Sequence, residues 1–361
     1  MTNRGAKPAK KERVGVPAIE DFGRFRRSLL GWYDRNRRDL PWRKTRDPYA
    51  IWLSEIMLQQ TRVAAVLEHY RLFLELFPDV ETLAAAHEDA VLAAWSGLGY
   101  YRRARMLHQC AREIIERHGG KFPETAVALR DLPGIGRYTA AAIASIAFRE
   151  PIAVVDGNVD RVLQRVGGRR LSSAQTWELA QALVSKSRPG DCNQAMMELG
   201  ATVCVPKGPR CGECPVAGSC VTRVRELQAE GSGLSALQMA PVPRQSKREI
   251  WCSLEHGDGH VRLVRRPKNV SLMAGMWELP QWTAVPQEAA GDATWRTFRH
   301  SITVTDYTVH VLRSPNIDPS DGNGATGRTH AGRGKWVAIK TIPGLPITGL
   351  TRKILKADGI I

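Results

Sequence analysis

Four of the seven cysteines lie close together, and thiolates at this density could hold a metal group. They are Cys204, Cys211, Cys214 and Cys220, in the spacing Cys-x6-Cys-x2-Cys-x5-Cys. Soft thiolate ligands suit either zinc or an iron–sulfur cluster. Zinc fingers and ribbons usually bring two close cysteine pairs, and this segment has a single x2 pair, so the spacing favours the cluster. The alternative is four unpaired structural cysteines, which such dense clustering disfavours.

The other three cysteines, Cys110, Cys192 and Cys252, lie in apolar segments, where we expect buried thiols. An odd total with four clustered members is not typical of a secreted disulfide framework. The cysteine pattern therefore indicates an intracellular chain with one metal site.

A second chemical feature is the turn Leu132-Pro133-Gly134-Ile135-Gly136. Two glycines let the backbone turn tightly and approach a ligand closely. Their amides, with the N-terminus of a helix expected from about Tyr138, would form an anion site that grips phosphate without reading sequence. Leu132, Gly134 and Gly136 are therefore candidate DNA contacts. The alternative is an ordinary turn between two helices, because a bare Gly-x-Gly is weak evidence.

Two carboxyl groups stand in surroundings that suit chemistry. Glu55 lies in the apolar run 51–58, where desolvation would raise its pKa and keep it a proton donor. Asp156 lies in Val-Val-Asp-Gly-Asn, 20 residues after Gly136, between apolar residues and a glycine. Taken singly, Asp156 would more often be a helix cap and Glu55 a solvated helix residue.

The overall charge indicates a polyanionic partner. Lys and Arg total 52 against 36 Asp and Glu, a formal net charge of +16. Such a surface favours nucleic acid, although a merely basic protein has the same composition. Residues 1–20 are Lys-rich at their start and lack apolar periodicity, so we expect a basic mobile tail. With neither a long apolar run nor a signal region, we expect a cytoplasmic, nucleoid-associated protein of bacterial type.

The elements that must position these residues are helices from 21 to 225. Apolar residues recur there at three- and four-residue steps, with short Gly, Pro and Asn turns between the runs. The expected helices cover 25–33, 49–58, 63–76, 81–95, 103–117 and 139–148, and a further helix ends near Leu129.

The composition changes after the helical region. Gly, Ser and Pro residues mark a linker over 226–246. Beyond it, alternation with period two predicts strands at 260–264, 302–305 and 307–311, so 247–361 should form an α+β or mostly β domain. The Gly-, Asp- and Ser-rich stretch 318–334 is expected to be a mobile loop.

The glycine turn, the downstream aspartate and the cysteine loop together resemble the endonuclease III superfamily of helix-hairpin-helix DNA glycosylases. Three segments, 54–61 (SEIMLQQT), 97–102 (GLGYYR) and 155–159 (VDGNV), resemble its A/G-specific adenine glycosylases, the MutY family. The resemblance is dense over 20–225 and implies a [4Fe-4S] cluster on the four clustered cysteines. It is loose over 247–361, where it implies a Nudix-like domain that senses 8-oxoguanine.

The resemblance implies base excision, in which adenine is protonated and the sugar acquires oxocarbenium character. It assigns protonation of adenine N7 and activation of water to Glu55, and stabilisation of the sugar to Asp156. Asn158 and Tyr138 would orient these groups, and Arg43 would support the Glu55 region or contact DNA. Bifunctional relatives have a lysine nucleophile where this chain has Tyr138. Tyrosine cannot form an imine, so we predict a monofunctional enzyme that leaves an abasic site.

An extruded base leaves a gap in the duplex, and Gln60 and Tyr100 match the family's wedge residues beside the orphan base. The plainer explanations are the polarity of a helix end for Gln60 and core packing for Tyr100. Lys207 and Arg210 in the cysteine loop would contact phosphate. Candidates for the walls of the adenine pocket, which could equally be core, are Trp42, Leu58 and Val63.

The C-terminal region gives weaker evidence. Residues 275–280 (GMWELP) fit a Nudix-like fold, but no Arg-Glu-x-x-Glu-Glu cluster follows, so we expect no metal-dependent phosphohydrolase. Two registers match the family's Phe-Ser-His contact to 8-oxoguanine: 298–300 (FRH) and 302–304 (ITV). We favour the second, because the strand would continue in phase, and Thr303 would then contact the base.

We therefore predict a monomeric, monofunctional DNA glycosylase that excises adenine mispaired with 8-oxoguanine or guanine in double-stranded DNA. One alternative is a thymine-mismatch or endonuclease III-type glycosylase, whose relatives usually lack the C-terminal domain. Another is a non-catalytic iron–sulfur DNA-binding sensor, which the retention of both Glu55 and Asp156 disfavours.

Overall fold

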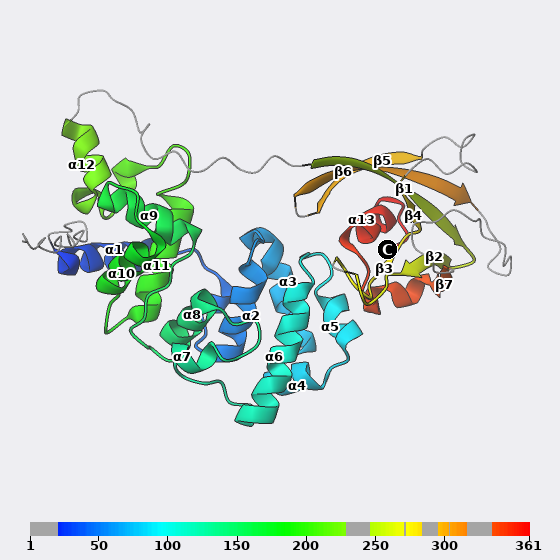
Figure 1. The fold of residues 1–361 in the computed structure, drawn as a ribbon, viewed down its shortest axis with the longest axis horizontal. Coiled ribbons are helices and arrows are strands. Elements are labelled where there is room, and N and C mark those ends of the chain that lie inside the picture. Colours follow the sequence, from blue (N-terminus) through cyan, green and yellow to red (C-terminus); the bar gives the residue numbers. More distant parts are fainter. Residues whose placement is uncertain (1–20, 229–245, 271, 284–294, 303, 316–333) are drawn as a thin grey trace, which may run out of the picture. The chain divides into compact units, whose positions relative to one another are not determined.

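The structure is a computed structural model that describes residues 21–228, 246–270, 272–283, 295–302, 304–315 and 334–361 (Figure 1). The expected basic tail, 229–245 of the expected linker and 318–333 of the expected loop lie outside the described residues. The described residues divide into two compact units. The first comprises 21–46, 124–130 and 135–228, and the second comprises 47–123, 131–134 and the described residues from 246 to 361. No described helix is both long and apolar enough to cross a membrane.

The described part of the first unit is helical. Its helices are α1 (Phe22–Asn36), η1 (Pro41–Arg43), α7 (Ala126–Leu129), α8 (Arg137–Ala147), α9 (Gly157–Gly167), α10 (Ser173–Leu183), α11 (Pro189–Thr202), η2 (Cys211–Glu213), η3 (Ala217–Ser219) and α12 (Val221–Gln228). Polar side chains start several of them. Thr125 caps α7, and Ser172 caps α10 in a reciprocal pair with Gln175. Leu29 of α1 and Leu199 of α11 are fully buried in one apolar cluster that joins these helices to α9.

The second unit begins with five helices: α2 (Pro48–Leu58), α3 (Val63–Leu76), α4 (Val80–Ala85), α5 (Glu88–Ala94) and α6 (Arg102–His118). The single helix expected over 81–95 is wrong, because α4 ends at Ala85 and α5 begins at Glu88. Ala86 has extended backbone, and the His87 ring accepts a hydrogen bond from the Asp89 amide, so His87 caps a new helix. The other expected helices are confirmed, with small shifts of their ends.

A mixed sheet of seven strands forms the described C-terminal part of the second unit. Its elements are β1 (Ser246–Gly257), β2 (His260–Arg265), β3 (Trp277–Glu278), β4 (Gln281–Trp282), β5 (Arg296–Ile302), β6 (Thr305–Pro315), β7 (Lys335–Ala338), η5 (Ile339–Gly344) and α13 (Gly349–Ala357). The strand order is β3-β2-β1-β6-β5, with β4 on β1 and β7 on β2. Strands β1 and β6 run parallel, and α13 packs on the sheet by burying Ile354 in a cluster with Cys252 and Val309 (Figure 1). The predicted α+β class is confirmed.

The expected strand over 302–305 is wrong. Strand β5 ends at Ile302, Val304 lies in a turn, and Ile302 pairs with Thr305 across the antiparallel β5/β6 hairpin. Alternating residues continue across the turn because both strand ends contribute them, so the sequence pattern hides the reversal. The in-phase argument for the second register therefore fails, and Thr303 itself lies outside the described residues. Phe298 lies inside β5 and is buried.

Candidate functional site

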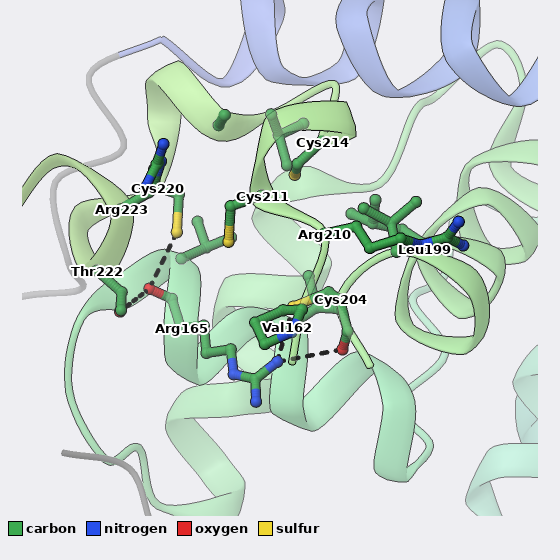
Figure 2. A pocket seen from close by; sticks show the side chains of 15 residues that line it. Val162, Arg165, Leu199, Cys204, Arg210, Cys211, Cys214, Cys220, Thr222 and Arg223 are labelled. Carbon is green, nitrogen blue, oxygen red and sulfur yellow. Dashed lines mark hydrogen bonds between the residues drawn. The ribbon is translucent and has the colours of Figure 1, made fainter. Parts of the chain in front are cut away.

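The four clustered cysteines line one cavity in the first unit (Figure 2). The cavity is lined by Val162 and Arg165 of α9, Leu199 of α11, and half of the residues between Cys204 and Arg223, the four cysteines among them. All four thiols are half-buried, and Cys204, Cys214 and Cys220 also pack against the apolar core of the unit. Burial raises the pKa of Cys214 to about 11 and also raises that of Cys220. The three cysteines expected to be core residues, Cys110, Cys192 and Cys252, are buried as predicted.

The chemistry of these side chains suits a thiolate-bound metal group. Four soft thiolates on one cavity are the donor set that an iron–sulfur cluster takes. The donor set and the shared cavity therefore fit a cluster bound by all four cysteines.

Two arginines of α9 tie the cysteine loop to the rest of the unit. Arg165 donates to the Cys204 thiol sulfur at 3.3 Å and to the carbonyl of Val205 at 2.8 Å. Arg161 donates to the Cys204 carbonyl at 2.9 Å through Nε and to Asn158 Oδ1 at 2.8 Å through Nη2. Arg161 therefore joins the cysteine loop to the turn that contains Asp156.

Asp156 is the N-cap of α9, as its plainer interpretation predicted. One carboxylate oxygen accepts from the Val159 amide at 2.7 Å, and the other accepts from Asn158 Nδ2 at 3.0 Å. The side chain is half-buried. Helix α11 approaches this turn so closely that a Cβ on Gly200 would lie 2.6 Å from the Asn158 Cβ. Asn158 is thus fixed between Asp156 and Arg161, and Asp156 is held with a defined orientation.

Tyr138 lies on α8, directly after the glycine turn. Its hydroxyl donates to the Met197 sulfur at 3.3 Å. Gly136 is the N-cap of α8 and brings no side-chain cap, which leaves the first amides of this helix to other acceptors. Gly134 has a φ of +76°, and a Cβ there would lie 2.9 Å from the Met106 Cβ, so both conformation and space require glycine. Leu132 is buried, with only 3% of its surface exposed.

Glu55 lies in the last turn of α2, in the second unit. Helix α2 starts at Asp47, whose side chain caps the amides of Tyr49 and Ala50, and Pro48 fits the first helical position. Residues 49–57 of this helix are buried without a break, and Glu55 is only 6% exposed. The alternative of a solvated helix glutamate is therefore wrong.

The two predicted wedge residues share a conformation that the sequence did not reveal. Gln60 has a φ of +55° and Tyr100 a φ of +49°. A non-glycine residue in this region costs about 1–3 kcal/mol and persists only where its surroundings enforce it. Both side chains are exposed, and Tyr100 keeps 44% of its surface accessible, so core packing does not explain Tyr100.

The three candidates for an adenine pocket differ in their surroundings. Trp42 is buried in η1 of the first unit. Leu58 ends α2 and Val63 begins α3 in the second unit, and both are half-buried. Partial exposure at two helix ends leaves Leu58 and Val63 able to contact a ligand.

The contacts of Arg43 contradict its predicted role as a DNA contact. Its side chain is 10% exposed and donates to Glu198 Oε2 at 2.7 Å, and its guanidinium lies 5.5 Å from the Tyr33 ring centroid. Arg38 donates to the same carboxylate. A buried guanidinium that Glu198 already engages is not available to phosphate, so Arg43 serves the packing of the first unit.

The two basic residues of the cysteine loop also differ. Arg210 donates to the Thr202 carbonyl and lies 3.4 Å from Glu213, so it mainly braces the loop. Lys207 is exposed between Pro206 and Gly208.

The loop of Tyr100 also contacts the C-terminal part of the second unit. The Ile347 carbonyl accepts from Ser96 Oγ at 2.9 Å and from the Tyr101 hydroxyl at 3.3 Å. Arg352 of α13 donates to Ser96 Oγ at 3.0 Å. Burial raises the pKa of Tyr101, which keeps its hydroxyl a donor. The Tyr100 loop is therefore joined through buried polar contacts to the C-terminal part of the second unit, here called the sheet domain.

Sequence reasoning missed three residues that the structure places at these sites: Arg103, Arg161 and Glu198. Arg161 lies one turn after Asn158 on α9, which could have suggested it. Arg103 donates to three carbonyls at the end of α2, more than forty positions earlier, and Glu198 pairs with arginines more than 150 positions earlier. No local pattern therefore distinguishes Arg103 and Glu198 from the other charged residues.

Comparison with known proteins agrees with this arrangement. Residues 53–186 match the model of the HhH-GPD superfamily of base excision DNA repair proteins. The chain is 43% identical over 325 residues to the adenine DNA glycosylase of Rattus norvegicus, spanning 74% of this chain and 62% of the rat protein. It is 40% identical over 317 residues to that of Schizosaccharomyces pombe, spanning 71% of this chain and 69% of the yeast protein. The chain thus spans about three fifths of its mammalian relatives.

Solved structures point to the same fold. A thermostable thymine-DNA glycosylase is 33% identical with a TM-score of 0.53, over 56% of this chain and 95% of that one. An endonuclease III–DNA covalent intermediate, 22% identical with a TM-score of 0.51, covers 58% of this chain and 99% of its own, which shows a shared fold. From the superfamily match and the identity over two thirds of the yeast relative, this chain belongs to the adenine DNA glycosylase family of HhH-GPD base excision repair proteins.

Proposed function

We propose that this protein is a monofunctional DNA glycosylase that removes adenine mispaired with 8-oxoguanine or guanine and leaves an abasic site. The observation that best supports the proposal is the contrast between its two carboxyl groups. Glu55 is only 6% exposed in an apolar helix, whereas Asp156 is half-buried and is oriented by hydrogen bonds from a backbone amide and from Asn158. Cleavage of an N-glycosidic bond needs one carboxyl group as an acid and another as a stabilising anion.

The proposed chemistry follows from these surroundings. Burial among apolar side chains favours the neutral acid, so Glu55 donates its proton to adenine N7 and afterwards accepts a proton from the attacking water. Asp156 is bound through donors to both oxygens, and it stabilises the positive charge that develops on the sugar. Asn158 orients Asp156. Tyr138 has no amine for a Schiff base, so the strand stays intact.

The proposal includes a [4Fe-4S] cluster held by Cys204, Cys211, Cys214 and Cys220. When bound, the cluster supplies a cross-link among four points of one loop and neutralises thiolates that are costly to bury. Arg161 connects that loop to Asn158 and thereby to the turn of Asp156. Lys207 extends from the loop to a DNA phosphate.

The proposal assigns recognition of the opposite base to the Nudix-like C-terminal domain, 247–361. Its support is the joint at Ile347, where the sheet domain contacts Ser96 and Tyr101 beside the wedge residue Tyr100. A conformational change of this domain when it binds 8-oxoguanine can therefore be transmitted to Tyr100 through these buried hydrogen bonds. We expect the enzyme to act as a monomer on double-stranded DNA.

Single-turnover base release tests the proposal. The full chain is mixed in excess with duplexes that contain A·8-oxoguanine, A·G or T·G, and the products are resolved after heating in alkali. We expect adenine release from the first two duplexes, faster with 8-oxoguanine. The 33% identity to a thymine-DNA glycosylase makes T·G the necessary comparison. Thymine release alone would favour the thymine-mismatch alternative, and binding without any release would favour the sensor.

A further inference from the structure

A single guanidinium lies at the centre of the two loops that display Gln60 and Tyr100. Arg103, the second residue of α6, donates through Nη1 to the carbonyls of Ile56 at 2.8 Å, Met57 at 2.9 Å and Gln59 at 2.5 Å. These bonds bring it to the end of α2 and the start of the loop that contains Gln60. The interaction spans more than forty positions of sequence.

The other terminal nitrogen of the Arg103 guanidinium reaches the loop that contains Tyr100. Arg103 Nη2 donates to the carbonyls of Leu98 and Gly99, both at 3.2 Å, and to Thr61 Oγ1 at 3.1 Å. The guanidinium carbon lies 5.5 Å from the Tyr100 ring centroid and 5.4 Å from that of Trp95. One side chain thus contacts the residues on both sides of Gln60, and it also contacts the Tyr100 ring and the two residues before Tyr100.

The electrostatics favour a permanent cation in this position. Helix α2 has no basic residue in its last turn, so its free carbonyls lack an intrahelical donor and a compensating charge. Arg103 supplies both from another helix. Burial lowers its pKa to about 10, which leaves it charged at neutral pH. The same helix end contains Glu55, one residue before Ile56.

We propose that Arg103 is the positioning residue that holds the loops of Gln60 and Tyr100, and the end of α2, in the conformation that base extrusion requires. This inference rests on the proposed function for its link to adenine release. Arg103 does not contact DNA in this role. It enforces two left-handed backbone positions that neither Gln60 nor Tyr100 would adopt by themselves.

The test compares Arg103→Lys with the wild-type full chain. Lysine keeps the charge but is a compact donor that cannot span both loops. We expect adenine release under single turnover to fall about 10- to 100-fold, the scale of a small misplacement of reacting groups. Fluorescence of 2-aminopurine beside the target adenine, measured in the Asp156→Asn background, should show a matching loss of extrusion. The control is Arg117→Lys at the other end of α6, whose arginine is exposed and pairs with Glu113.

Two further measurements separate positioning from other roles. Hydrogen exchange should accelerate at 59–61 and 98–100 and stay unchanged in the rest of α2, α3 and α6. Exchange that accelerates throughout these helices would overturn the proposal, because Arg103 would then be a general structural residue. The salt dependence of DNA binding is measured in Arg103→Gln, because lysine would keep the charge. Its slope should match that of the wild type, and a slope reduced by about one would overturn the proposal by showing a phosphate contact.

Wild-type-like release and exchange in Arg103→Lys would also overturn the inference. If the wild type itself releases no adenine, the proposed function fails, yet the exchange comparison still decides whether Arg103 holds the two loops.

Discussion

At the scale of single residues, Asp156 has two roles that one substitution can separate. As the N-cap of α9 it accepts the Val159 amide, and asparagine caps a helix nearly as well as aspartate. We therefore expect Asp156→Asn to keep the fold and to slow single-turnover adenine release by about 10²- to 10⁴-fold, because the anion is lost. The control is Asp79→Asn at the N-cap of α4, where Asp79 accepts the Thr82 amide. Unchanged release in Asp156→Asn would refute its catalytic assignment.

Tyr138 gives a second prediction at this scale. The wild-type protein should release adenine without nicking the strand, and borohydride should trap no covalent complex with the abasic product, because no lysine stands at this position. Tyr138→Lys should yield a trappable complex. Tyr138→Phe, which removes the hydroxyl that donates to Met197, should not. Gel analysis without alkali or heat makes the measurement, and spontaneous nicking by the wild type would contradict the monofunctional assignment.

At the scale of elements, the cysteine loop is expected to depend on its metal group. Cys204→Ser should abolish the visible absorption of an iron–sulfur cluster and lower DNA affinity, because Lys207 loses its fixed backbone. Cys192→Ala is the matched control, since that thiol is buried in α11 of the same unit outside the cavity. Bound zinc without iron in the purified wild type would contradict the cluster.

The ion pair that joins α11 to α1 and η1 predicts a pH dependence. Burial alone would raise the pKa of Glu198, but hydrogen bonds from Arg38 and Arg43 outweigh it and lower the pKa to about 2, from the ordinary 4.5. A depressed carboxyl pKa stabilises the fold above the unfolded pKa, and this stabilisation is lost as pH falls through the folded pKa. The loss therefore occurs between about pH 4.5 and 2.

The variant Glu198→Gln tests this ion pair. It should cost about 3–5 kcal/mol at neutral pH, because it leaves two arginines beside a buried neutral group. The difference in unfolding free energy between wild type and variant should shrink below pH 4.5. Denaturant melts at stepped pH measure it, with the exposed Glu213→Gln as control. A difference that grows on acidification would refute the assignment.

At the scale of the whole molecule, a net charge of +16 predicts binding to duplex DNA that weakens steeply with salt. Each phosphate contact adds about 0.9 to the slope of log affinity against log salt. Lys207→Ala should reduce that slope by about one and weaken all sequences alike. Lys44→Ala should leave it unchanged, because Asp39 already pairs with Lys44 at 2.8 Å. Fluorescence anisotropy over a salt series makes the comparison.

The fold was largely predictable because periodicity is local. Apolar steps of three and four residues placed most helices, and alternation placed β2 and much of β6. The failures have local causes too: His87 caps a new helix inside an apolar run, and the β5/β6 turn interrupts an alternation that continues on both sides. Thiol spacing likewise made Cys204 a candidate ligand without a structure, and the family resemblance made Glu55 and Asp156 candidate catalytic residues.

Only the tertiary structure decided which charged groups meet. Arg43 and Glu198 are 155 positions apart in sequence, and Arg103 reaches two loops from a third segment. Long-range pairing of this kind leaves no periodic trace, since any of 52 basic residues could supply the charge. The sequence by itself determined the family, the helical scaffold and the candidate chemistry, because these depend on residue type and local spacing. Burial of Glu55, the left-handed Gln60 and Tyr100, and the guanidinium between their loops depend on packing between distant segments.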